Sequence, residues 1–369
     1  MKILFFAERV NLDFFKGDSL LLKRMAEGLA EKGHEVHAVC HGSSDKIKIH
    51  APLHFWFYTK VFSFPLTSFF SFKKLFSLLN KEKFDAVIIK LPAFNGNSFW
   101  FNLKPLIQSH FYLKIALELK KRKTPFFVFI EGLTEKENFV SSFMGCSKEQ
   151  QLLLVEHSNG VISLSPEQNK LIQAKIPKTF FPAPVNTKKF VPTKNNQLNL
   201  PQEKINLLYL SSSCDLIDFL PFFDFLKSNN CVLHIISPAR NKNFLEEIKN
   251  RSLEKKIVFL KGIENQKLAE IIPAFDAGVY LKKFGFPFAD SSFMMKISEY
   301  LSCGLVVLVP EVNGPLIQSG KAGINFEKTK KISKKELQNL FLTARTIAVE
   351  NFDLEKNIKL IEAFLVENK

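Results

Sequence analysis

The chain has 369 residues, of which 46% are hydrophobic and 24% charged, a balance that is typical of ordinary globular domains. This composition excludes collagen, low-complexity disorder and highly charged disordered chains, and the length suggests two or three domains. The net charge is +15, and residues 1–190 contain 27 basic and 16 acidic side chains, which indicates an anionic partner such as phosphate groups, nucleic acid or an acidic membrane surface.

Short apolar runs alternate with amphipathic stretches along the first half of the chain. We predict strands at Lys2–Ala7, Glu35–Cys40, Phe84–Lys90, Pro125–Ile130 and Gly160–Leu164. Helices are predicted between them at Phe14–Lys32, Pro105–Lys123, Ser147–His157 and Ser165–Ala174. Strands that alternate with helices indicate a parallel sheet that is covered on both faces.

A second series of the same kind begins near residue 205, after a polar, proline-containing stretch that predicts a linker over residues 191–204. Its predicted strands are Ile205–Leu210, Val232–Ile236, Ile257–Leu260, Ala277–Leu281 and Leu305–Val309. Its predicted helices are Asp215–Lys227, Lys242–Arg251, Asn265–Pro273, Ser291–Ser302 and Lys334–Glu350. We therefore predict an α/β protein of two Rossmann-like, doubly wound parallel-sheet domains, 1–190 and 205–352, that face a cleft. A C-terminal helix over 353–369 is expected to pack back on the N-terminal domain.

The cysteine pattern and the apolar runs suggest where the protein is found. The five cysteines are widely spaced and form no CxxC pair, so we expect neither a disulfide framework nor a zinc site, and a reducing compartment fits best. The first apolar run is interrupted by Glu8 and Arg9 and is too short for the core of a signal peptide. No stretch of about 18 apolar residues is present, so we expect no transmembrane helix.

Four stretches in fixed order carry a resemblance to a known family. They are the first β-α-β segment Met1–Val39, SNGVISLSPEQNKLI at 158–172, FPAPVNTKKFVP at 181–192, and the pair of segments Ile257–Leu281 and Phe293–Val309. Together they resemble the retaining GT-B glycosyltransferases of the glycogen-synthase-like group, glycosyltransferase family 4. The resemblance implies a UDP- or GDP-linked sugar donor bound to the second domain and a glycan or lipid-linked acceptor bound to the first. It also implies that no metal ion or other cofactor is needed.

Glu299 is the best single candidate for donor binding. It lies on the predicted helix before the strand Leu305–Val309, and a carboxylate can accept hydrogen bonds from the vicinal hydroxyls of a ribose. In the family this residue is the second Glu of an E-x7-E pair, whose first position is Ser291 here. Lys296–Tyr300 match the family's K-x-x-EY pattern. The alternative is an exposed carboxylate on a helix.

The start of the same helix is a candidate site for the donor diphosphate. Free N–H groups at a helix N-terminus can hold phosphate oxygens, and we predict Asp290 or Ser291 as the capping residue. Lys296 can add a cation, although a solvated surface lysine is equally compatible with the sequence. The N–H groups in question belong to Ser291, Ser292, Phe293 and Met294.

Three further positions come mainly from the resemblance. Gly262 and Ile263 fall where relatives contact the nucleotide base, and Gly17 would let the backbone approach a ligand closely. Each also fits an ordinary turn.

Relatives often carry an Arg and a Lys after the first strand of the second domain, but SSSCDLIDF at 211–219 contains no cation. Because the charge of a phosphate leaving group has to be neutralised, this departure also leaves a weakened activity open.

Glu131 is our candidate catalytic residue in the first domain. It follows the predicted strand Pro125–Ile130, where many relatives carry a His, and it could hydrogen-bond sugar hydroxyls. A capping or salt-bridge role is the alternative. No nucleophile elbow, P-loop or HExxH motif is present.

A basic aromatic stretch lies between Asp45 and Glu82, where no carboxylate interrupts six lysines and ten aromatic residues. Such a pattern is typical of a surface that contacts anionic lipid, although many of these Phe residues could instead be core. We therefore expect a cytoplasmic protein, peripheral on the inner face of the membrane. No nucleic-acid-binding module accompanies the stretch, so no nucleic acid partner is expected. The residues chosen for the membrane contact are Lys60, Lys73, Lys74, Phe69 and Phe70.

Two rival functions stay open. One is a nucleotide-sugar epimerase on the same architecture. The other is a catalytically weakened GT-B protein that acts as a scaffold or partner subunit. The second is favoured by the missing phosphate cations and by the absent first Glu at Ser291.

Overall fold

The computed structural model describes residues 1–11, 17–41, 53–58, 66–90, 104–130, 148–193, 198–211, 214, 216–237, 242–260, 267–281 and 293–369. Within these ranges, the side chains of 8–11, 17–19, 41, 53–58, 66–71, 104–111 and 148–152 are not described. The chain divides into two compact units. Unit 1 comprises Met1–Phe181 and Glu355–Lys369, and unit 2 comprises Pro182–Leu354.

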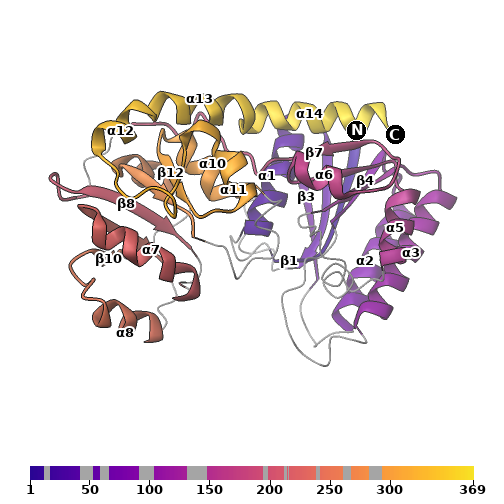
Figure 1. Ribbon diagram of the computed structural model, residues 1–369. Helices are drawn as coiled ribbons and strands as arrows, with labels where there is room; N and C mark the ends of the chain where they lie inside the picture. The colour runs from indigo at the N-terminus through magenta and orange to yellow at the C-terminus, as the bar shows by residue number, and fades with distance from the viewer. Residues whose placement is uncertain are drawn as a thin grey trace. The chain divides into compact units, whose positions relative to one another are not determined.

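Unit 1 contains a parallel sheet of seven strands in the order β3-β2-β1-β4-β5-β6-β7 (Figure 1). The chain builds outward from β1 in both directions, so the topological switch point lies between β1 and β4. The strands are β1 (Lys2–Asn11), β2 (Glu35–His41), β3 (Leu53–Tyr58), β4 (Ala86–Lys90), β5 (Phe126–Phe129), β6 (Gly160–Ser163) and β7 (Lys178–Phe180).

Helices cover both faces of this sheet. One face packs on α2 (Leu66–Lys81), α3 (Lys104–Lys121) and α5 (Lys148–His157), whose apolar side chains share a core cluster with β1, β4 and β5. In α2, Phe72, Leu75 and Leu79 recur at helical spacing and are buried. Two further helices of this unit are α1 (Gly17–Glu31) and the short α6 (Pro166–Leu171).

The C-terminal helix α14 (Leu354–Glu367) packs in unit 1, although most of unit 2 lies between it and the rest of unit 1 in the sequence. Phe127 of β5 points away from the cluster that contains Phe126, and its ring lies 5.6 Å from that of Phe364. Glu362 Oε1 lies 2.8 Å from Nε2 of His34, the residue before β2. These contacts place α14 on the sheet face opposite α2 and α3.

Unit 2 contains a second parallel sheet, of six strands in the order β10-β9-β8-β11-β12-β13. Here the chain builds outward from β8, so the switch point lies between β8 and β11. Every residue of β8, β9, β11 and β12 is buried, which is typical of a sheet with both faces covered. The strands are β8 (Ile205–Leu210), β9 (Cys231–Ile236), β10 (Ile257–Phe259), β11 (Ala277–Val279), β12 (Val306–Val309) and β13 (Gly323–Asn325).

Helices lie on both faces of the second sheet (Figure 1). A cluster of buried side chains occupies each face. The first contains side chains of α7 (Leu216–Ser228), α8 (Lys242–Asn250) and α12 (Lys334–Asn339). The second contains side chains of α9 (Leu268–Ile271), α10 (Met295–Ser302) and α13 (Phe341–Asn351). The remaining helix α11 (Asn313–Ser319) is joined to β13 by a single 3-10 turn, and another such turn, Ile272–Ala274, follows α9.

The predicted fold class, α/β with two doubly wound parallel sheets, is confirmed. The predicted strand Ile205–Leu210 has the same bounds as β8. The predicted helix Lys334–Glu350 is wrong in one respect, because it is divided at Leu340 into α12 and α13. Among the described residues, no helix is long and apolar enough to cross a bilayer.

Gly160 offers a test of the packing of α14. A Cβ at this position would lie 2.5 Å from Cζ of Phe364 and 3.1 Å from the carbonyl oxygen of Pro177. We predict that Gly160→Ala lowers the free energy of unfolding by about 1–3 kcal/mol through overpacking, as measured by urea denaturation. The double variant with Phe364→Leu should recover part of the loss. Unchanged stability in Gly160→Ala would contradict the packing of α14 in unit 1.

Candidate functional site

The switch point of unit 2 brings the ends of β8 and β11 together. Val279 pairs with Tyr209 in register, so Tyr280 follows beside Leu210, the last residue of β8. In doubly wound sheets, ligands bind outside the carboxyl ends of the strands at such a switch point. The carboxyl ends of β8 and β11 are therefore where unit 2 is best placed to bind a ligand.

Helix α10 is attached to the end of β8 by two of its side chains, which lie one turn apart. The N–H of Leu210 donates to Oη of Tyr300 at 3.0 Å, and Nζ of Lys296 donates to the carbonyl of Leu210. The Tyr300 ring covers Gly278 of β11 so closely that a Cβ there would overlap it. Burial raises the pKa of the Tyr300 phenol well above its usual range, so the group stays neutral. The ammonium of Lys296 thus lies at the carboxyl end of β8.

Glu299 lies in the middle of α10 and is 3% exposed. The alternative of an exposed helix carboxylate is therefore wrong. Burial raises the pKa of the Cys303 thiol, one turn further along the helix, and the Glu299 carboxylate adds to this increase. Lys296 is half-buried and bonded to Leu210, so it is not a freely solvated surface lysine either.

The start of α10 differs from our prediction. The helix begins at Met295, and Met294 is the N-cap, with extended backbone angles (φ −109°, ψ 129°) and no capping bond from its side chain. The predicted start at Ser291, capped by Asp290 or Ser291, is wrong. The physical reason lies in Gln318, whose side-chain amide binds the backbone of Met294 and holds it extended.

The other predicted donor residues are placed as follows. Phe293 is buried, and its ring lies 5.9 Å from that of Phe352, so its side chain belongs to the core. Gly17 is the first residue of α1. Ser291, Ser292, Gly262, Ile263 and the candidate catalytic residue Glu131 lie outside the described residues. The structure therefore brings together Lys296 and Glu299 on α10. The prediction that the N–H of Met294 binds the diphosphate is wrong, because this N–H donates to Gln318 Oε1.

The predicted membrane patch is described only in part. Lys73 is exposed and Lys74 half-buried on α2. Phe69 and Phe70 lie on the same helix, but their side chains are not described, and Lys60 is outside the described residues.

Two buried polar residues at the strand ends were missed by the sequence analysis. Tyr280 is 7% exposed, and its hydroxyl has no hydrogen-bond partner among the described residues. Lys90 ends β4 next to the switch point of unit 1 and is 5% exposed. Each residue ends an apolar run in the sequence, AGVY for Tyr280 and AVIIK for Lys90. A polar residue at the carboxyl end of such a run is the sequence feature that could have identified them.

Comparisons with known proteins bear on the fold. No family model matches the chain, and no curated protein matches it. Several solved structures match over almost their whole length. A glycosyltransferase from Rickettsia africae ESF-5 is 15% identical, with 100% of this chain and 99% of that chain covered and a TM-score of 0.70. HepE from Anabaena, solved with UDP, is 15% identical, with 100% of both chains covered and a TM-score of 0.67.

Sucrose-phosphate synthase from Thermosynechococcus elongatus is 14% identical, with 100% of this chain and 97% of that chain covered and a TM-score of 0.63. This chain has the GT-B fold. At such low identity the likeness is one of architecture and assigns no role to an individual residue of this chain.

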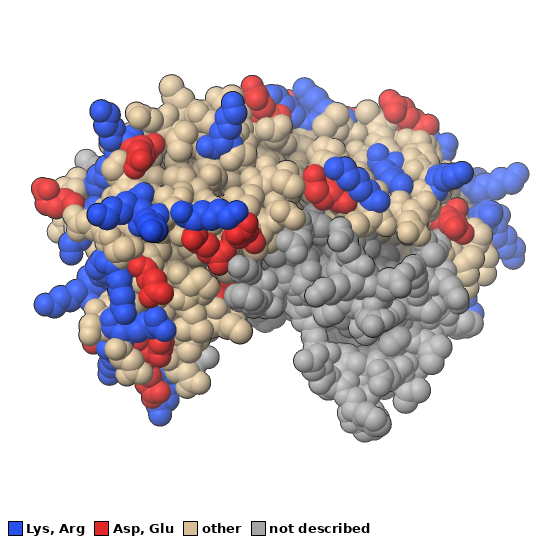
Figure 2. Space-filling view, viewed as in Figure 1, with Lys and Arg blue, Asp and Glu red and all other residues tan. Residues whose placement is uncertain are grey.

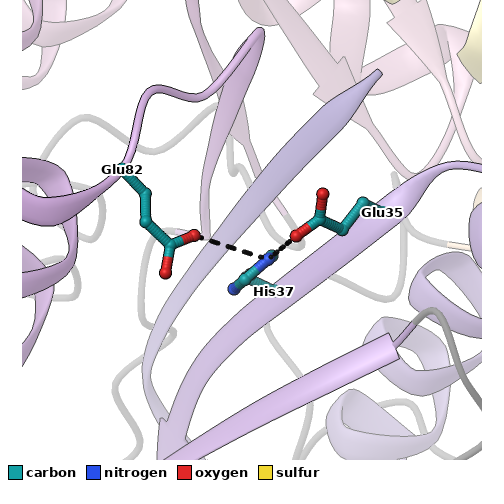
Figure 3. Close-up of side chains that lie close together, drawn as sticks. All are labelled: Glu35, His37 and Glu82. Carbon is teal, nitrogen blue, oxygen red and sulfur yellow. Dashed lines mark hydrogen bonds and ion pairs between the residues drawn. The ribbon is translucent and has the colours of Figure 1, made fainter.

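A separate polar cluster in the first GT-B unit has the composition of a metal site. Figure 3 shows Glu35 and His37 on β2, with Glu82 facing them from the segment after α2. His37 Nε2 lies 2.8 Å from Glu35 Oε1 and 3.8 Å from Glu82 Oε2. However, Nζ of Lys2 lies 2.9 Å from Glu35 Oε1 and 2.7 Å from Glu82 Oε2, so an ammonium already occupies the position of a cation.

The location of this cluster also separates it from ligand binding. Lys2 and Glu35 are the first residues of β1 and β2, and Glu82 precedes β4. The cluster thus lies at the amino ends of the strands, the opposite end from the one where doubly wound sheets bind ligands. We conclude that it is an ion-pair network that ties together the three segments entering the sheet.

This network predicts a pH dependence of stability. Hydrogen bonds from His37 and Lys2 lower the pKa of Glu35 from 4.5 to about 2. A carboxyl group with a depressed pKa in the folded state stabilises the fold above its unfolded pKa, and this contribution is lost as the pH falls towards 2. We therefore predict that Glu35→Gln flattens the loss of stability between pH 5 and pH 2, as measured by thermal unfolding. Glu367→Gln, at an exposed position of α14, is the control. If Glu35→Gln lost as much stability between pH 5 and pH 2 as the wild type does, the ion-pair network would be contradicted.

Proposed function

We propose that the protein is a glycosyltransferase that moves a sugar from a UDP- or GDP-linked donor to a glycan or lipid-linked acceptor. The donor binds at the carboxyl ends of β8 and β11. The observation that carries the proposal is the pair Lys296 and Glu299, a cation and a buried carboxylate held on one helix at the switch point of a Rossmann-like sheet. The UDP and UDP-glucose complexes of HepE, which shares the fold, support this class of donor.

Lys296 supplies the positive charge for the donor diphosphate. The segment after β8 contains no Arg or Lys, although a departing diphosphate needs its developing charge stabilised. The Lys296 ammonium lies at that place in space because it donates to the carbonyl of Leu210. An ammonium has three N–H donors, so one group can bind the strand end and a phosphate oxygen together.

Glu299 takes the ribose in this proposal. A carboxylate accepts hydrogen bonds from two vicinal hydroxyls, and a buried one does so without competition from bulk water. The acceptor would bind unit 1, where Lys90 ends β4. The candidate Glu131, which follows the β5 segment in the sequence, lies outside the described residues. Retention of configuration and independence of metal ions are the finer parts of the proposal and follow from the family resemblance.

Two substitutions separate these roles. Lys296→Met should weaken binding of UDP by about 10- to 100-fold, through the loss of a charge-assisted hydrogen bond, and leave uridine nearly unaffected. Glu299→Gln should weaken the binding of uridine and of UDP alike, because both ligands contain the ribose. Affinities can be measured by thermal shift, since a ligand of the native state raises the melting temperature.

Lys335→Met, at an exposed position of α12, is the matched control. Hydrolysis of a panel of nucleotide sugars by the wild type reports turnover, and both site variants should reduce it. If the folded wild type binds neither UDP nor GDP, the transferase proposal fails and a scaffold function is favoured. Conversion of the donor sugar to its epimer without an acceptor would identify the epimerase alternative.

We further propose that unit 1 contacts an anionic membrane surface, on the inner face of the membrane. On the face shown in Figure 2, basic and acidic side chains are interspersed over the described surface of both units. At the ends of α2 and α3, by contrast, basic residues predominate. Arg122 joins these ends by donating to the carbonyl of Leu79 and to Oδ1 of Asn80. The exposed basic residues there are Lys81, Lys83, Lys120, Lys121, Arg122 and Lys123.

Charge reversal tests this surface. Each basic residue near an anionic bilayer contributes about 1 kcal/mol, so the combined change of Lys120, Lys121 and Lys123 to Glu should weaken binding at least about 100-fold. Binding is measured by sedimentation with phosphatidylserine-containing vesicles at low salt. The same change at three exposed lysines of unit 2 is the control, namely Lys330, Lys331 and Lys335. Equal binding by both triple variants would contradict the proposed surface.

A further inference from the structure

The side-chain amide of Gln318 is buried against the start of α10. Gln318 lies on α11 and is 1% exposed. Its Oε1 accepts a hydrogen bond from the N–H of Met294 at 2.6 Å, and its Nε2 donates to the carbonyl of Met294 at 2.8 Å. Nε2 also donates to Oγ of Ser298 at 2.9 Å. The amide therefore bonds both backbone groups of one residue, as a neighbouring strand would.

This pairing controls where α10 begins. Met294 has no capping bond from its own side chain, and its carbonyl also accepts the N–H of Ile297 at 3.1 Å, closing the first turn. Gln318 thus holds the residue at which the extended segment becomes helix. Because the bonds to Met294 act on both of its peptide groups, they restrain the direction of the chain as well as its position.

Gln318 is the second of two anchors of α10. The first is Leu210, which binds Lys296 and Tyr300. The contact with Leu210 does not restrain the N-terminal end of α10. The Gln318 amide restrains this end by binding Met294. Met294, held by Gln318, and Tyr300, held by Leu210, restrain the two ends of this short helix, and Lys296 and Glu299 lie between them in the sequence.

We propose that Gln318 is a positioning residue for the donor site. It touches no part of the nucleotide and acts by holding Met294, so that Lys296 meets the diphosphate and Glu299 the ribose of a nucleoside diphosphate. This inference rests on the function proposed above. The expected loss of affinity is large enough to measure, because displacement of a binding group by about 1 Å can lower the affinity of a preorganised site about 100-fold.

The substitution Gln318→Glu tests the proposal through pH. An ionised carboxylate keeps an acceptor for the N–H of Met294 but has no donor for the Met294 carbonyl. A protonated carboxyl has one O–H donor and one acceptor, which restores the two-way pairing. Burial raises the pKa of such a carboxyl, so protonation falls within a range that the folded protein tolerates.

We expect Gln318→Glu to bind UDP 10- to 100-fold more weakly than the wild type at pH 8. The ratio of the two dissociation constants should fall towards one as the pH is lowered. Gln318→Leu should bind UDP more weakly than the wild type at every pH. Ser298→Ala, which loses only one hydrogen bond, should show a smaller loss of UDP affinity. Gln338→Glu, at an exposed position of α12, is the matched control and should bind as the wild type does.

Affinities are measured at a temperature well below the melting temperature of every variant, so that unfolding does not enter the comparison. A merely structural role predicts lower melting temperatures with unchanged dissociation constants, and that result would overturn the proposal. If Gln318→Leu does not fold, the pH series of Gln318→Glu decides the question alone. If the wild type itself binds neither UDP nor GDP, the donor site fails and this inference fails with it. Binding by the wild type, together with an equal affinity in Gln318→Leu or in Gln318→Glu at a pH where its carboxyl is ionised, overturns the inference alone.

Discussion

The docking of α10 on the last residue of β8 is the interaction on which the proposed donor site depends. Leu210 uses both of its backbone groups for this contact, donating to Tyr300 and accepting from Lys296. The contact is possible because β11 has glycine under the Tyr300 ring, so the helix can approach the sheet closely. Without this docking, the ammonium of Lys296 would not lie at the carboxyl end of β8, and the helix that carries Glu299 would not be held there.

The position of polar groups along the strands separates structural clusters from candidate binding groups. Glu35, His37 and Lys2 satisfy one another at the amino ends of the first sheet, where no ligand is expected. Polar groups buried at the carboxyl ends, Lys90 and Tyr280, lie where the fold places its ligands. Whether a buried polar group lies at the amino or the carboxyl ends of the strands thus separates the two kinds of group better than its residue type does.

The sequence predicted the parts of the fold that local patterns determine, such as β8, whose apolar run is bounded by polar residues. It failed for β3 and α2, because the Phe-rich stretch there was interpreted as a membrane-contacting surface, although Phe72, Leu75 and Leu79 recur at helical spacing. The structure buries Phe72 of α2 in the core, so part of that aromatic content serves packing. Lys296 and Glu299 were chosen because Lys296–Tyr300 resemble the K-x-x-EY pattern of a known family, and their binding roles stay predictions. The bond from Gln318 to Met294 spans 24 residues, and no local pattern reveals such a partner.

A crystal structure of the protein with UDP tests the central claim most directly. The account predicts that the diphosphate lies outside the carboxyl end of β8 within hydrogen-bond distance of Lys296 Nζ, and that the ribose hydroxyls donate to Glu299. A nucleotide bound away from α10, or bound there with Glu299 turned from the ribose, would contradict it.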